Sequence, residues 1–163
     1  MISKSHILLI MCDIYTSKGI ITRPNAFFLR EYDPIEKSFS KTIIIDVKHR
    51  KLPTKLIQKL EDISILKICW DEEKTSLILE TLIHEAGFDI KVLPILDLKK
   101  WLRNNAYTHS SLNAIAKNLH IRQCSKANTK DIDKLRNRFN VFVSVMRKLI
   151  NIDTQNLVDG ILF

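Results

Sequence analysis

Runs of apolar residues separated by short polar stretches organise the first part of the chain. His6 to Ile14, Ala26 to Glu31 and Lys41 to Val47 have the apolar and aromatic composition of strands, and Ile20-Ile21 extends the second of them. Asp33 to Ser38 lies between two such runs and contains the Asp, Pro and Ser residues of a turn. We therefore expect three antiparallel strands joined by hairpins.

The rest of the chain alternates two further strands with helices. Ser64 to Trp70 and Asp89 to Leu96 are apolar runs of strand length. Segments with helical spacing of apolar residues begin at Pro53 and cover Glu73 to Ala86, Leu98 to Leu102, Ser111 to Leu119 and Asp131 to Ile150. This order predicts an α/β fold whose mixed five-stranded sheet, three antiparallel hairpin strands followed by two parallel strands, is flanked by helices.

The last helix has the clearest period in the chain. Its apolar residues recur three and four positions apart, at Ile132, Leu135, Phe139, Phe142, Met146 and Leu149. This stripe predicts a core-facing side. The length of 163 residues fits a single domain over residues 1–150 and a C-terminal tail over residues 151–163. The tail ends on apolar residues, so it is expected either to pack on the domain or to dock a partner.

Positive charge is concentrated in the last third of the chain. The formal net charge is +8, and between Ala114 and Leu149 nine basic residues face two acidic ones. Lys126, Lys130, Lys134 and Arg138 are spaced by four and would form one stripe on a helix, which Lys117, Arg122 and Arg136 widen. Such a patch favours a polyanionic partner such as nucleic acid, although a solvated helix face would look the same. The run Lys48-His49-Arg50-Lys51 is a second, smaller basic cluster.

The length of the apolar runs and the positions of the cysteines indicate the cellular compartment of the protein. No run approaches the roughly 20 apolar residues that cross a bilayer, so no membrane association is expected. Cys12 and Cys69 lie in apolar runs, which predicts buried free thiols in a reducing, cytoplasmic environment.

Four stretches, met in the right order, resemble the DnaQ-like (DEDD) 3′–5′ exonucleases. Leu9 to Ser17 resembles the strand-borne Asp-x-Glu-Thr-Thr signature, and Ile68 to Leu79 resembles the family's passage from strand to helix. Leu96-Asp97-Leu98 with Ser111 to Ile121 resembles its "Asp-Thr-Leu … Ser-Leu-x-x-Leu" stretch, and Asn128 to Leu149 stands where it has a His-x-Ala-x-x-Asp helix. The resemblance covers nearly the whole chain and implies a ribonuclease-H-like exonuclease fold.

The active site implied by this resemblance is incomplete. These enzymes hold two divalent metals between four carboxylates, and a His or Tyr serves as general base. The first carboxylate corresponds to Asp13, but Tyr15 and Thr75 occupy the next two positions. Asp131 or Asp133 corresponds to the last, and no His or Tyr precedes either at the family's spacing. The three acids are therefore vestigial catalytic candidates. Turn chemistry explains Asp13 equally well, and helix capping is the favoured explanation of Asp131 and Asp133.

These departures favour a catalytically impaired exonuclease-fold protein that binds nucleic acid, or a nucleic-acid-processing partner, without cleaving it. The resulting nucleic-acid-binding candidates are Lys117, Arg122, Lys126, Lys130, Lys134 and Arg138, with Tyr15 as a base-stacking residue. No cofactor is expected for this function.

Two alternatives stay open. A divergent 3′–5′ exonuclease would bind Mg or Mn through Asp13, a helix acid and an acid of the Asp71–Glu73 turn. A protein-interaction subunit would present its basic face to an acidic protein partner.

Overall fold

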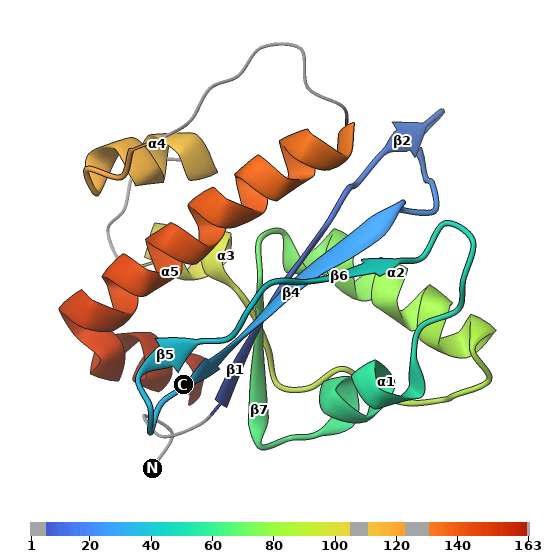
Figure 1. Ribbon diagram of the computed structural model, residues 1–163, viewed down its shortest axis with the longest axis horizontal. Coiled ribbons are helices and arrows are strands. Elements are labelled where there is room, and N and C mark those ends of the chain that lie inside the picture. Colours follow the sequence, from blue (N-terminus) through green and yellow to red (C-terminus); the bar gives the residue numbers. More distant parts are fainter. Residues whose placement is uncertain (1–5, 105–110, 123–130, 163) are drawn as a thin grey trace. The chain divides into compact units, whose positions relative to one another are not determined.

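The computed structural model describes residues 6–104, 111–122 and 131–162 (Figure 1). The chain divides between Asp97 and Leu98 into two compact units. The first, called here the strand unit, contains the described strands and two helices; the second, the helical unit, contains the remaining helices. A single domain over residues 1–150 stays a prediction.

The antiparallel half of the sheet is built around one long strand. Strand β4 (Ala26–Asp33) pairs antiparallel with β1 (His6–Cys12) on one side. On its other side β4 pairs with two short antiparallel strands, β5 (Ser38–Phe39) and β6 (Ile43–Asp46). The predicted meander is confirmed: β6 lies within the predicted third strand, and β5 is a short additional piece before it.

The parallel half of the sheet lies on the other side of β1. Strand β7 (Ile65–Cys69) pairs parallel with β1, and β8 (Ile95–Asp97) pairs parallel with β7. Strand β8 is shorter than the run Asp89 to Leu96 suggested. It begins only after Pro94, because proline has no N–H to donate to the ladder. The predicted sheet of mixed parallel and antiparallel strands is confirmed.

A small second sheet corrects one prediction. Strands β2 (Thr16–Ser17) and β3 (Ile20–Ile21) form a hairpin of their own, so the two isoleucines do not extend the second strand of the main sheet. The reason is local: Lys18 and Gly19 have φ angles of 52° and 79°, which turn the chain back on itself.

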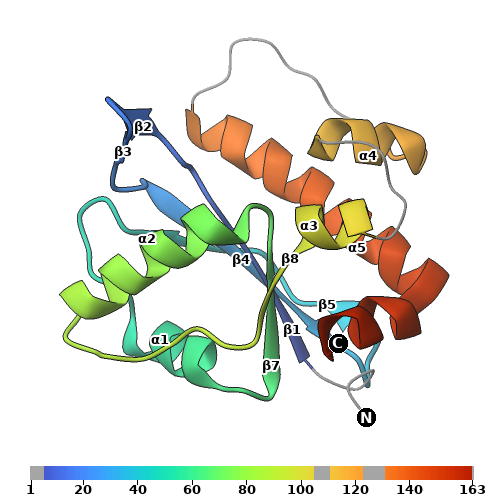
Figure 2. The same ribbon diagram turned by 180° about the vertical axis from the view of Figure 1, so that it is seen from behind.

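Helices α1 (Thr54–Glu61) and α2 (Glu72–Glu85) lie side by side on one face of the sheet (Figure 2). Their apolar faces and alternate residues of β1 and β4 form one core, whose buried members include Leu8, Ile10, Phe27, Leu29, Leu56, Ile57, Leu60, Ile78, Leu79, Leu82 and Ile83. Alternation along the strands decides which side chains enter this core, because successive residues of a strand point to opposite faces. Burial of each large side chain contributes about 1.5–3 kcal/mol.

The helical unit consists of α3 (Leu98–Asn104), α4 (Leu112–Asn118) and α5 (Asp131–Leu162). Helix α4 begins where Ser111 caps it, since the Ser111 Oγ accepts the N–H of Ala114 at 3.1 Å. Helix α4 packs against α5.

The apolar stripe of α5 is buried as predicted from Leu135 onwards, at Leu135, Phe139, Phe142, Met146 and Leu149. Ile132 is 41% exposed, so the stripe does not reach the first turn of the helix.

Helix α5 also continues past the predicted end at Ile150 to Leu162. No proline interrupts residues 151–162, so no residue there forbids the backbone from remaining helical. Packing or partner docking by this tail stays a prediction. Across the described residues, no helix has the length and apolar character needed to span a membrane.

Candidate functional site

Three aspartates mark one edge of the sheet in the strand unit. Asp13 follows β1, Asp71 lies just beyond β7, and Asp97 ends β8. Because β1, β7 and β8 are adjacent and parallel, their carboxyl ends meet at the same edge, where α/β proteins place their functional groups. The sequence indicated Asp13 and the Asp71 turn. Asp97 was considered only within a resembling motif, although its place after a short apolar run was an available signal.

Asp13 is fully engaged by the protein itself. Its side chain is largely buried, with 9% exposure. Both carboxylate oxygens accept the backbone N–H of Asn25 at 2.9 Å, and Oδ2 also accepts Asn25 Nδ2 at 2.8 Å. Oδ1 accepts the N–H of Ala26 at 3.2 Å. The carboxylate therefore fastens the end of β1 to the start of β4, and its lone pairs are directed at protein donors.

The positions that the resemblance assigns to the partner acids of Asp13 do not fit a two-metal site. Tyr15 is 42% exposed and carries no carboxylate, and Thr75 is buried in the second turn of α2 with 1% exposure. Within the described side chains, no three His, Cys, Asp or Glu groups come together in a way that could hold a metal ion. Two hard divalent cations need several carboxylate oxygens at short range.

Asp71, in the turn before α2, has contacts of its own. The backbone N–H of Asp71 donates to Asp97 Oδ1 at 3.2 Å. The Asp71 carboxylate lies 4.0 Å from Lys74 Nζ, one turn along the helix. Asp71 adopts a left-handed backbone conformation with φ of 71°, which Asp tolerates better than most residues. Within the part of the chain described, no acid of this turn belongs to a cluster of three groups that could hold a metal ion.

The thiol of Cys12, next to Asp13, has a raised pKa. Burial, and to a smaller extent the negative charge of Asp13, raises the pKa of Cys12 to about 12. Cys12 and Cys69 are both buried free thiols, as predicted.

We expect iodoacetamide at pH 8 to modify neither Cys12 nor Cys69 in the folded protein and both in denaturant, because the thiolate is the reactive form. Mass spectrometry of the alkylated peptides measures this. Rapid labelling of either residue under native conditions would contradict the burial described here.

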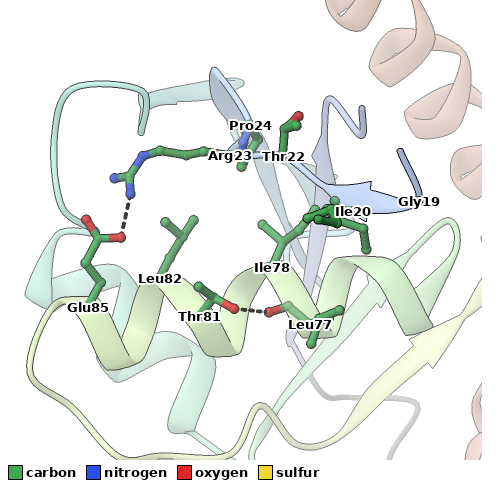
Figure 3. A pocket seen from close by; sticks show the side chains of 11 residues that line it. Gly19, Ile20, Thr22, Arg23, Pro24, Leu77, Ile78, Thr81, Leu82 and Glu85 are labelled. Carbon is green, nitrogen blue, oxygen red and sulfur yellow. Dashed lines mark hydrogen bonds and ion pairs between the residues drawn. The ribbon is translucent and has the colours of Figure 1, made fainter. Parts of the chain in front are cut away.

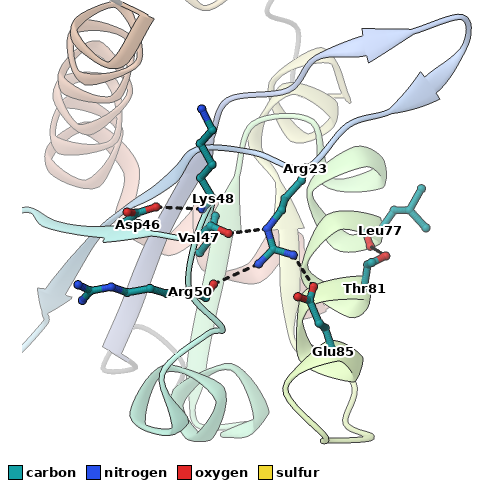
Figure 4. Close-up of polar contacts among 8 residues, drawn as sticks. All are labelled: Arg23, Asp46, Val47, Lys48, Arg50, Leu77, Thr81 and Glu85. Atoms are coloured by element: carbon teal, nitrogen blue, oxygen red, sulfur yellow. Dashed lines mark hydrogen bonds and ion pairs between the residues drawn. The ribbon is translucent and has the colours of Figure 1, made fainter.

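A hydrogen-bonded network extends from Asp13 through Asn25 to the turn that follows β6. Figure 4 shows the part of it around Arg23, Val47 and Lys48. The Asn25 carbonyl oxygen accepts the N–H groups of Val47 and Lys48 at 3.0 and 3.2 Å. Arg23 donates through Nε to the Val47 carbonyl at 2.6 Å and through Nη2 to the Arg50 carbonyl at 3.1 Å. Its Nη1 pairs with Glu85 of α2 at 2.5 Å. One arginine thus ties together three segments that are distant in sequence.

A groove of about 500 Å³ lies between residues 19–24 and α2 (Figure 3). Its walls include the exposed Ile20 and Leu77. Among the described residues that line it, Glu85 is the one carboxylate, and Arg23 neutralises it. The groove therefore offers apolar contact and no acid cluster.

The helical unit contains the predicted basic residues. Lys117, Arg122, Lys134 and Arg138 are exposed, as a binding surface requires. Lys126 and Lys130 lie outside the described residues, so the four-residue stripe is described only at Lys134 and Arg138.

Of the two predicted acids of α5, Asp133 has a described side chain and Asp131 does not. Asp133 lies 3.7 Å from Arg136 Nη1, a pair at i,i+3 on the helix surface. The side chain of Asp131 lies outside the description, and its role at the start of α5 stays a prediction.

Comparisons with known proteins give similarity in structure alone. Neither the protein-family models nor the curated proteins contain a match to the sequence. Among solved structures, a 3′-exonuclease described for 3′-end specific recognition of histone mRNA stem-loop is similar with a TM-score of 0.66 and 8% sequence identity, over 93% of this chain and 84% of that one. The nuclease domain of 3′hExo, a DEDDh family member bound to rAMP, is similar with a TM-score of 0.60 and 11% sequence identity, over 93% of this chain and 94% of that one. Brucella melitensis NrnC is similar with a TM-score of 0.59 and 13% sequence identity, over 94% of this chain and 78% of that one.

These similarities agree with the sheet order and with the motif order in the sequence. At such low identity they establish the fold and leave the activity open. The chain has the fold of the DnaQ-like (DEDD) 3′–5′ exonucleases.

Proposed function

We propose that this protein uses an exonuclease fold to bind nucleic acid without cleaving it. The observation that carries the proposal is the state of Asp13, whose carboxylate accepts hydrogen bonds from Asn25 and Ala26. A carboxylate engaged in this way has little capacity left for a metal ion. Tyr15 and Thr75 stand at two positions where the resembling enzymes have the acids on which metal-dependent hydrolysis depends.

Nucleic acid is the partner that charge and fold favour together. The exposed Lys117, Arg122, Lys134 and Arg138 supply cations for phosphate contacts, and the half-exposed Tyr15 offers a ring for base stacking. The structural neighbours are nucleases. A cytoplasmic location belongs to the same proposal, supported by buried cysteines that form no disulfide with one another.

The test combines cleavage and binding on the same samples. Labelled single-stranded DNA and RNA are incubated with the protein and Mg²⁺ or Mn²⁺, and binding is read by fluorescence anisotropy in EDTA. We expect no shortened products, and binding that weakens steeply with salt because counterions are released.

A conservative variant identifies the source of any activity. Shortening from the 3′ end that disappears in Asp13→Asn would refute the proposal and establish a divergent Mg- or Mn-dependent exonuclease. Absence of both cleavage and binding would refute it in favour of a protein-interaction subunit.

A further inference from the structure

The strand unit contains a basic segment that is separate in sequence from the proposed basic residues of the helical unit. Residues 48–59 contain five Lys and Arg residues and no Asp or Glu. Four of them, Lys48, Arg50, Lys51 and Lys55, are exposed. Within the described residues, Lys59 is the member of this segment with an ion pair, to Glu31. The first turn of α1 contains no acidic residue that would offset the charge.

The turn from Lys48 to Lys51 is held in place at both ends. Val47 before it has 0% exposure and Leu52 after it has 4%, and both belong to the core under α1 and α2. Between these anchors the basic side chains project outward, and Figure 4 shows Lys48 and Arg50 pointing away from the network that holds their backbone. A surface fixed before binding loses less conformational entropy when a ligand arrives.

Hydrogen bonds with Arg23, Asp46 and Asn25 fix the backbone of the turn. Arg23 donates to the carbonyls of Val47 and Arg50. The Asp46 Oδ1 accepts the N–H of Lys48 at 2.9 Å, and Asn25 accepts the same N–H at 3.2 Å. A positively charged arginine is thus used to support a turn that already carries three cations. Glu85 compensates the charge of Arg23, so this support adds no net positive charge to the turn.

Asp13 is the far end of this network. It fixes Asn25 through both the backbone and the side-chain amide, and Asn25 fixes Lys48. Asp13 and the basic turn are thus joined through Asn25 in one hydrogen-bonded network.

We propose that the turn Lys48–Lys51, together with Lys55, is a second surface that binds the phosphodiester backbone of nucleic acid, and that Asp13 positions it through Asn25. The proposal rests on the proposed nucleic-acid function. The turn has no apolar side chain between Lys48 and Lys51, which suits phosphate contacts better than a protein interface with an apolar centre.

The test neutralises the surface without touching the core. The triple variant Lys48→Gln/Arg50→Gln/Lys51→Gln is compared with Lys18→Gln/Lys37→Gln/Lys91→Gln, which removes the same charge from exposed positions elsewhere in the strand unit. Anisotropy with labelled single-stranded DNA and RNA is measured in EDTA from 50 to 300 mM salt, with poly-glutamate as a competing polyanion.

We expect the turn variant to bind about 10-fold more weakly at 100 mM salt, and its plot of log affinity against log salt to flatten by about 2, since each single-strand phosphate contact contributes roughly 0.7. The control variant is expected to change by less than about 3-fold, through long-range charge alone. A difference between the DNA and RNA arms identifies which nucleic acid the turn prefers.

Two results would overturn the inference without affecting the proposed function. One is an equal loss of affinity, relative to the wild type, in the turn variant and the control variant. The other is poly-glutamate displacing nucleic acid at equal charge, which would assign the turn to an acidic protein. If the wild-type protein binds no nucleic acid at all, the proposed function and this inference are both refuted.

Discussion

Replacing Asp13 with alanine is expected to lower the free energy of unfolding by about 3 kcal/mol, because the N–H groups of Asn25 and Ala26 lose their charged acceptor in a largely buried place. Asp13→Asn should cost less, since an amide oxygen still accepts one of these bonds. Urea unfolding of the three proteins, followed by circular dichroism, measures the differences.

A matched control is available at the far end of β4. The carboxylate of Asp33 also accepts two backbone N–H groups, those of Ile35 and Glu36, but in an exposed turn. Water can replace it there, so Asp33→Ala should cost less than about 1 kcal/mol. Equal losses for Asp13→Ala and Asp33→Ala would show that Asp13 has no special anchoring role.

Alkaline pH is expected to stabilise the protein through Lys67. This lysine is buried with 0% exposure, and its Nζ donates to the carbonyl oxygens of Asp62 at 2.5 Å and Leu93 at 2.9 Å. Burial lowers the pKa of Lys67 to about 8, while the negative charge of Asp62 acts in the opposite direction. The unfolded chain keeps the ordinary value of 10.5, so it binds more protons than the folded chain between pH 8 and 10.5.

Stability must therefore rise with pH in that window. We expect the free energy of unfolding of the wild type to increase by about 2 kcal/mol from pH 8 to 10, relative to Lys67→Met, which has no titrating group at this position. Denaturant unfolding at several pH values gives both curves. Parallel curves would mean that the Lys67 ammonium is solvated in the folded state.

Much of the fold was readable from local pattern. The apolar runs at His6 to Ile14 and Ser64 to Trp70 gave two central strands, and the three- and four-residue period after Asp131 gave α5. These elements were predictable because a side chain's face follows from its position along a strand or helix. The short hairpin of β2 and β3 was missed, since it depends on the backbone angles of Lys18 and Gly19.

The candidate site was predictable only in part. The resemblance in the sequence suggested Asp13 as the first carboxylate and placed Tyr15 and Thr75 where partner acids are expected, and these assignments stay predictions. The basic residues of the last third of the chain are plain in the sequence. The role of Arg23 could not be read in advance, because its partners Val47, Arg50 and Glu85 lie 24 to 62 residues away.

What the sequence by itself determined was the order of the main strands and helices, and the residue types at the positions that the resemblance compares with the family's acids. What only the tertiary structure decided was where the remaining carboxylate points. Asp13 meets Asn25 because β1 and β4 pair in a register that sets Cys12 opposite Phe27. A shift of one residue would turn every side chain of a strand to the other face, and local sequence does not specify which pairing the sheet adopts.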